Sequence, residues 1–169
     1  PSRRGQFIAP DGSPAGPHRG IAHYTVGQRK GLGVACAHPV YVTGIDAVAN
    51  TVTLGEVADL MASGLVADDW IWSAPANVME ELLDEAGETG LPVSAKIRYR
   101  HPAQPARLRR ATRGTTGSSA GANAIAENAA NAFELIFDSS ERGIAPGQAV
   151  VAYAGDIVLG GGTVVRAIK

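Results

Sequence analysis

Residues 91–110, LPVSAKIRYRHPAQPARLRR, decide the fold that we expect for this chain. Small or apolar residues alternate here with polar and charged ones, which is the two-residue period of a β-strand with one buried face. The residues predicted to share the inward face are Val93, Ala95, Ile97 and Tyr99. The residues predicted for the outward face are Lys96, Arg98 and Arg100. If Ile97 is buried, Tyr99 points inward with it, which leaves the two arginines as the surface contacts.

The rest of the chain has the composition of a mostly β protein. Its 169 residues include 21 glycines and 10 prolines, and 45% are hydrophobic, a mixture that favours short strands joined by turns. Residues 39–56, PVYVTGIDAVANTVTLGE, predict a hairpin that turns at Ala49 and Asn50. Further strands are predicted over residues 133–138 and 149–169, and the glycines at 160–162 are expected to separate the last two.

Helical signals are few. Residues 78–88, VMEELLDEAGE, predict one helix that ends at Gly87. The residues predicted for its apolar face are Val78, Leu82 and Leu83. Residues 56–66 predict a short helical turn that closes at Gly64. Two aromatic residues between these segments share one face of a predicted strand and are expected to pack in the core or between domains: Trp70 and Trp72.

We expect two domains. Residues 1–66 would form a small domain around the hairpin, with residues 1–20 as an extended lead-in, because this stretch is rich in Gly, Pro and Arg. Residues 67–169 would form a β-barrel of short antiparallel strands. Residues 112–132, which are rich in Gly, Ser, Ala and Asn, are expected to form a loop within the barrel.

Charge is unevenly distributed along the chain. The formal net charge is -1, yet ten acidic residues and no Lys or Arg lie between Gly31 and Ala95. A basic run without acidic residues follows, made up of Lys96, Arg98, Arg100, Arg107, Arg109, Arg110 and Arg113. Such a run is typical of a surface that binds a polyanion. The alternative is a solvated strand edge, where Lys and Arg discourage pairing with another sheet.

A second basic segment is glycine-rich. In HYTVGQRKGLG, residues 23–33, the glycines at 27, 31 and 33 allow a positive φ and a close approach of the backbone. The residues between them, Gln28, Arg29 and Lys30, are donors suited to phosphate groups or base edges. The spacing is not that of the nucleotide-binding GxxxxGK[ST] loop. The alternative is a glycine-rich turn with exposed basic residues.

Several other chemistries are excluded or find no support. Cys36 is the only cysteine, so it forms no internal disulfide or CxxC motif, and we expect it to be a half-buried apolar residue. The histidines lack the spacing and partners of a metal site: His18, His23, His38 and His101. No stretch approaches the ~20 apolar residues of a membrane-spanning helix. We expect a cytoplasmic chain and, because it begins at Pro1 without Met, a piece of a longer protein.

Four motifs together point to a known family. They lie at residues 18–34, 39–56, 95–102 and 145–164, with the sequences HRGIAHYTVGQRKGLGV, PVYVTGIDAVANTVTLGE, AKIRYRHP and APGQAVVAYAGDIVLGGGTV. In order and spacing they resemble the central and C-terminal domains of the bacterial tRNA-specific 2-thiouridylases, formerly called tRNA (5-methylaminomethyl-2-thiouridylate)-methyltransferases. The resemblance runs from about His18 to Val165 and leaves out the low-complexity loop.

The resemblance implies both fold and function. The fold would be a small β-hairpin central domain followed by a six-stranded antiparallel β-barrel like the second domain of translation elongation factors. Members of the family carry an N-terminal PP-loop domain that adenylates the wobble uridine, U34, in tRNAs for Lys, Glu and Gln, after which a persulfide sulfur replaces the oxygen. That domain and its two catalytic cysteines match nothing here, and Cys36 matches neither cysteine. We therefore expect no catalytic residue and no cofactor in this chain, with ATP and Mg²⁺ belonging to the parent enzyme.

The resemblance also implies contact residues. The tRNA-contacting Arg-Tyr pair of the family matches Arg98 and Tyr99, and the glutamine of its PGQ motif matches Gln148. The GQRKG motif, which lies near the catalytic cleft in the family, matches the segment that contains Gln28, Arg29 and Lys30. The charge pattern adds the outward residues Lys96 and Arg100. Together these residues form the expected RNA-binding set.

Two functions follow from these expectations. In the first, the chain binds and orients tRNA for the missing N-terminal catalytic domain. In the second, it is a protein-interaction module that docks a catalytic domain or a sulfur-relay protein through Trp70, Trp72 and the acidic helix. We do not expect the chain to act as an enzyme alone.

Overall fold

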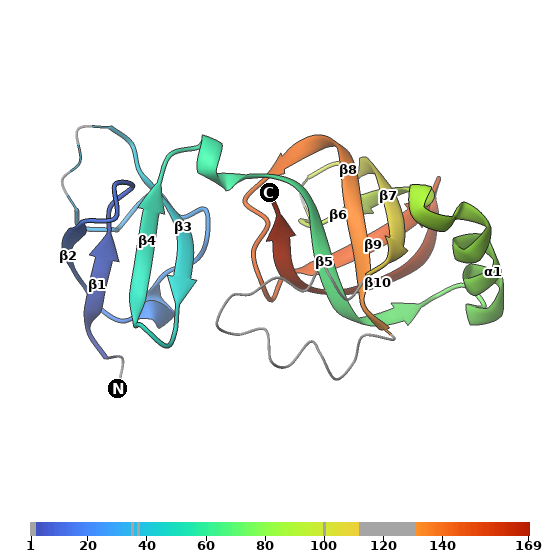
Figure 1. The fold of residues 1–169 in the computed structure, drawn as a ribbon, viewed down its shortest axis with the longest axis horizontal. Coiled ribbons are helices and arrows are strands. Elements are labelled where there is room, and N and C mark those ends of the chain that lie inside the picture. The colour runs from blue at the N-terminus through green and yellow to red at the C-terminus, as the bar shows by residue number, and fades with distance from the viewer. Residues whose placement is uncertain (1–2, 35, 37, 100, 112–130) are drawn as a thin grey trace. The chain divides into compact units, whose positions relative to one another are not determined.

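The computed structural model describes residues 3–34, 36, 38–99, 101–111 and 131–169. The chain divides into two compact units between Met61 and Ala62, and each is described by itself (Figure 1). Within the described ranges no helix combines the length and the apolar character needed to cross a bilayer.

The first unit is a four-stranded sheet with the order β2-β1-β4-β3. Its strands are β1 (Gly5–Ile8), β2 (Pro14–His18), β3 (Tyr41–Asp46) and β4 (Thr51–Gly55). The pairs β1/β2 and β3/β4 are antiparallel, whereas β1 and β4 are parallel. The predicted hairpin over residues 39–56 is confirmed. The prediction of an extended lead-in over residues 1–20 is wrong, because β1 and β2 complete the sheet.

Two prolines explain why the sequence pattern does not indicate this edge strand. Pro14 and Pro17 lie in β2, which is an edge strand of the sheet. Proline lacks the N–H that a central strand needs, so it occurs in sheets mainly at edges and bulges. The register of β1 against β2 shifts between Phe7 and Ile8, which places an irregularity in the same pair. A strand with two prolines in five residues carries no alternation signal that a sequence alone would show.

An aromatic cluster fills the core of the first unit. The rings of Phe7, His18 and Tyr24 meet edge to face with centroids 5.1 to 5.6 Å apart. His18 is buried, and its Nδ1 accepts from the Gly20 N–H at 2.9 Å, so Nε2 carries the hydrogen and donates to the Asn50 carbonyl at 3.1 Å. His18 is thus a core residue whose two ring nitrogens are both hydrogen-bonded.

The second unit is a closed six-stranded barrel with the strand order β10-β5-β8-β7-β6-β9 (Figure 1). Its strands are β5 (Met61–Trp72), β6 (Leu91–Lys96), β7 (Gln104–Arg110), β8 (Phe133–Arg142), β9 (Ala149–Ala154) and β10 (Ile157–Ile168). The predicted six-stranded antiparallel barrel is confirmed. The interior is filled by buried side chains that include Leu65, Leu108, Leu135 and Val150.

The tryptophans belong to this interior. The rings of Trp70 and Trp72 lie 5.5 Å apart, and each lies 5.2 Å from the ring of Phe133. Trp70 is 5% exposed, so the expectation of core packing is confirmed. The glycines at 160–162 were expected to separate two strands. This prediction is wrong, because all three lie inside β10. A Cβ at Gly160 or Gly162 would lie 2.9 Å from atoms of Trp70, so these glycines make room for the ring.

The helical predictions are partly corrected. Residues 56–66 hold only a single 3-10 turn, Ala58–Leu60, and β5 begins at Met61. The helix α1 (Ala76–Ala86) does end at Gly87, which has a φ of 53°. Its buried residues are Met79 and Leu83, which are four residues apart and face the barrel. Val78 and Leu82, two of the three residues predicted for that face, are exposed.

Candidate nucleic-acid interface

Four of the predicted contact residues line one cavity on the barrel. Lys96, Arg98 and Tyr99 reach it from the end of β6, and Gln148 reaches it from the turn before β9. The cavity has a volume of about 390 Å³, and its other lining residues are Ile97, Ala149, Val151 and Tyr153. These distant segments meet because β6 pairs with β9, with Lys96 opposite Val151.

Tyr99 lies on the surface. Its exposed fraction is 92%, although Ile97 is buried as expected. The alternation stops because β6 ends at Lys96, and the chain then turns so that the His101 N–H donates to the Arg98 carbonyl at 3.2 Å. The prediction that Tyr99 points inward with Ile97 is therefore wrong. The ring is open to a partner on almost all sides.

Arg98 is anchored to the main chain. Its Nη2 donates to the carbonyl oxygen of Arg142 and, at 2.9 Å, to that of Gly143. Both acceptors lie at the end of β8 or just after it, so the guanidinium joins the end of β6 to a different part of the barrel. Arg98 is half-buried rather than the free surface cation that the alternation predicted.

Lys96 and Gln148 complete the set. The Nζ of Lys96 lies 5.8 Å from the centroid of the Tyr99 ring, within the range of a cation–π contact. The Gln148 side chain accepts from the Ala145 N–H through Oε1 at 3.0 Å, which fixes its orientation in the turn. The Gln148 carbonyl also accepts from the Val164 N–H at 2.7 Å. The Gln148 side chain is thus held in place before any ligand binds.

The basic run divides into two parts. Arg109 is paired with the buried carboxylate of Glu134 at 2.8 Å, and Arg110 lies 3.9 Å from Asp84 of α1. No carboxylate lines the cavity near Lys96 among the residues that the structure describes. Arg100 and Arg113 lie outside the described residues. Among the described cations of the run, Arg109 and Arg110 therefore face carboxylates, whereas Lys96 beside the cavity and Arg107 on the exposed face of β7 do not.

The glycine-rich segment forms a rigid turn against β3. Gly27 donates its N–H to the Val42 carbonyl at 2.8 Å, and the Val42 N–H donates to the Gln28 carbonyl at 2.9 Å. The glycines at 27, 31 and 33 have φ values of 88°, 77° and 74°, which confirms the predicted positive φ. The Gln28 amide bonds within the turn, accepting from the Thr25 N–H at 3.1 Å and donating to the Lys30 carbonyl at 2.9 Å. Arg29 and Lys30 are exposed.

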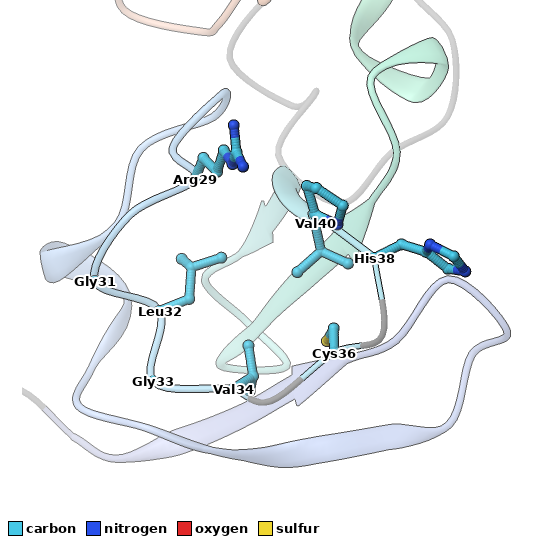
Figure 2. Close-up of a pocket in the computed structure, with 9 residues that line it drawn as sticks. Arg29, Gly31, Leu32, Gly33, Val34, Cys36, His38 and Val40 are labelled. Atoms are coloured by element: carbon cyan, nitrogen blue, oxygen red, sulfur yellow. The ribbon is translucent and has the colours of Figure 1, made fainter.

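A second, open pocket of about 430 Å³ lies beside this turn. Figure 2 shows the side chains of Leu32, Val34 and Val40 directed toward its hollow, with Cys36 among them and Arg29 at the rim. Cys36 is exposed, so the expectation of a half-buried residue is wrong. The described residues contain no group of three His, Cys, Asp or Glu side chains that could hold a metal ion.

Comparisons with known proteins place the chain in a family. The family model described as the tRNA methyl transferase PRC-barrel domain matches residues 1–56, and that described as the aminomethyltransferase beta-barrel domain matches residues 63–164. The tRNA-specific 2-thiouridylase MnmA of Solibacter usitatus is 39% identical over 160 residues, or 94% of this chain and 36% of that protein. Its counterpart from Geotalea uraniireducens is 39% identical over 165 residues, or 98% of this chain and 37% of that protein.

These matches define the class as a chain of two β domains found in tRNA-modifying enzymes. The chain belongs to the tRNA-specific 2-thiouridylase family, and it corresponds to the central and C-terminal domains of the members. It spans between a third and two fifths of the length of the curated relatives that it matches.

Proposed function

We propose that the chain is the tRNA-binding, substrate-orienting part of an enzyme that replaces an oxygen of the wobble uridine, U34, by sulfur. The observation that carries the proposal is the cavity shared by Lys96, Arg98, Tyr99 and Gln148. The names of the relatives, tRNA-specific 2-thiouridylases, support tRNA as the substrate. The use of ATP, Mg²⁺ and a persulfide sulfur belongs to the same proposal, as do tRNAs for Lys, Glu and Gln and a sulfur-relay partner. A cytoplasmic location belongs to the same proposal.

The cavity offers two interactions that commonly bind RNA, a positive charge for phosphate and an aromatic ring for stacking. Lys96 supplies a positive charge that no carboxylate of the lining offsets, and phosphate contacts of this kind release counterions. Tyr99 supplies an exposed ring, and unpaired bases of RNA loops commonly stack on aromatic side chains. The anticodon loop, which contains U34, is such a loop. Gln148 adds an amide whose orientation is already fixed.

A charge reversal tests this proposal. In the complete chain, Lys96→Glu should weaken the binding of tRNA at least tenfold, because it places a negative charge beside the phosphate. Arg107→Glu is the matched control, since it makes the same change at an exposed position of β7 that does not line the cavity. We expect a much smaller effect from the control. Equal losses for both variants, measured by fluorescence anisotropy with labelled tRNA, would contradict a localised site.

The second candidate, a protein-interaction module, has one supporting observation. Helix α1 exposes Val78 (42%) and Leu82 (38%) on a surface that also carries acidic residues. The tryptophan pair does not contribute, because Trp70 is buried and Trp72 packs against the core. Replacement of Val78 and Leu82 by Ser should then reduce the binding of a catalytic or sulfur-relay partner and leave tRNA binding unchanged. The Lys96→Glu variant should do the reverse.

A further inference from the structure

Tyr153 adds a second aromatic ring to the cavity. It lies in β9, opposite Ser94 of β6 and Val158 of β10, and it is partly exposed. Tyr153 and Tyr99 come from different strands and loops, yet both line the same cavity. Val151 lies opposite Lys96 across the two strands, two residues before Tyr153 in β9. The lining therefore combines the apolar side chain of Val151 and two tyrosine rings with polar groups from Lys96, Arg98 and Gln148.

The size and lining of the cavity fit one nucleotide. A volume of about 390 Å³ lies near the lower end of the range of about 300–1,000 Å³ for small-ligand cavities. Two tyrosine rings and a valine suit the faces of a base, which are apolar. The ammonium group of Lys96 suits a phosphate. A paired base in a duplex exposes no face to such a cavity, so the nucleotide has to be unstacked.

Arg98 has a different role from Lys96. Its Nη2 is used by the carbonyl groups of Arg142 and Gly143, which removes two of its five N–H donors from any ligand. Gly143 has a φ of 69°, and a Cβ at this position would lie 2.8 Å from Arg98 Nη2. The glycine thus makes room for the guanidinium. Because Arg98 directly precedes Tyr99, this anchor fixes the turn that presents the exposed ring.

We infer that the cavity is a site for one unstacked nucleotide of the RNA, with Lys96 on its phosphate and Tyr99 and Tyr153 against its base, and that Arg98 is a positioning residue. The inference rests on the proposed function, since it assumes that RNA is the ligand.

The dependence of affinity on salt tests the two roles. The complete chain is titrated with tRNA over a range of salt concentrations. Lys96→Gln should reduce the slope of log affinity against log salt by roughly 0.7 to 0.9, the value for one phosphate contact. Arg98→Gln should weaken binding and leave the slope unchanged, and Gly143→Ala should behave like it. Arg98→Lys should restore part of the affinity, because a lysine ammonium can donate to the same carbonyl groups. A smaller slope for Arg98→Gln would overturn its positioning role.

The form of the RNA tests the nucleotide site. Tyr153→Ala should weaken binding of an anticodon stem-loop by roughly 5- to 150-fold, the equivalent of one stacked base, and leave binding of a duplex of the same length unchanged. Tyr153→Phe keeps the ring and should retain most of the affinity. Equal losses for both RNAs would overturn the inference. If the native chain binds tRNA and no variant at the cavity changes this, the site is wrong but the proposed function stands. If the native chain binds no tRNA, the proposed function itself fails.

Discussion

Arg109 and Glu134 form a double hydrogen bond across β7 and β8. Nε and Nη2 of Arg109 lie 2.9 and 2.8 Å from Oε2 of Glu134, and the two residues are directly opposite in the register. The Glu134 side chain has no exposed surface, and its Oε1 has no hydrogen-bond partner among the described residues. The buried charge of Glu134 therefore depends on Arg109, which makes this basic residue structural.

Removal of the arginine should destabilise the barrel. Arg109→Gln leaves the Glu134 carboxylate buried without its cation, and we expect a loss of roughly 3 kcal/mol, at the lower end of the range for buried pairs because Arg109 is partly exposed. Urea unfolding followed by tryptophan emission measures the change, since both tryptophans lie in the barrel. Arg107→Gln, two residues away and exposed, is the control and should stay within about 0.5 kcal/mol. Similar losses for both would refute a special role for the pair.

The first unit depends on close contact at Gly5. A Cβ at this position would lie 2.6 Å from Nε2 of His18 and would also collide with the Asn50 carbonyl. We expect Gly5→Ala to destabilise this unit by about 1–3 kcal/mol, because the buried histidine has to move. Gly44→Ala is the control, since its Cβ would meet only Thr53 at an ordinary 3.7 Å. Hydrogen exchange of the Val52 and Thr53 amides reports on this sheet, and equal protection in both variants would count against the prediction.

A partly buried acid should make stability depend on pH. Burial raises the pKa of Asp68, and the charge of Asp69 raises this pKa further. The folded state then holds the proton more tightly than the unfolded state, so stability falls as pH rises from the unfolded pKa through the folded one. Asp68→Asn, which cannot ionise, should raise Tm at about pH 7 and give no such gain at about pH 3, where the carboxyl is protonated in both states. An equal shift at the two pH values, measured by differential scanning fluorimetry, would show that ionisation is not the cause.

The buried face of α1 can be tested with two truncations. Met79 is 1% exposed and Leu82 is 38% exposed. Met79→Ala should therefore cost about 2–5 kcal/mol, the range for buried Met or Leu, whereas Leu82→Ala should cost well under half as much. Urea unfolding followed by tryptophan emission again gives both values. A larger loss of stability for Leu82→Ala than for Met79→Ala would contradict this prediction and support the buried face predicted from the sequence.

Alternation predicted the barrel because most of its strands have one buried and one solvated face. It predicted the inward positions Val93, Ala95 and Ile97 correctly. It failed at Tyr99, because the two-residue period of a strand does not show where the strand ends. Here the end depends on the turn at Arg98 and on carbonyl groups more than forty residues further along the chain. Such a contact leaves no local signal in the sequence.

The basic run shows a similar limit. Composition identified Arg109 and Lys96 as equivalent cations, yet one is bound to a carboxylate and the other is not. The difference arises from the register of β7 against β8, which places Glu134 opposite Arg109. The prediction of the buried face of α1 failed for a related reason. Whether Leu82 or Met79 is buried depends on which side of the helix packs against the barrel. Motif resemblance predicted Tyr99 and Gln148 as contact residues, but it gave no sign that Tyr153 lines the same cavity.

The prolines of β2 have a consequence for contacts between molecules. The barrel closes on itself and leaves no unpaired strand, whereas the sheet of the first unit has β3 at one border and β2 at the other. Pro14 and Pro17 deprive that border of two amide donors in five residues. A second copy of the chain would find too few donors there to continue the ladder, so this border resists the strand-to-strand growth that leads to aggregation.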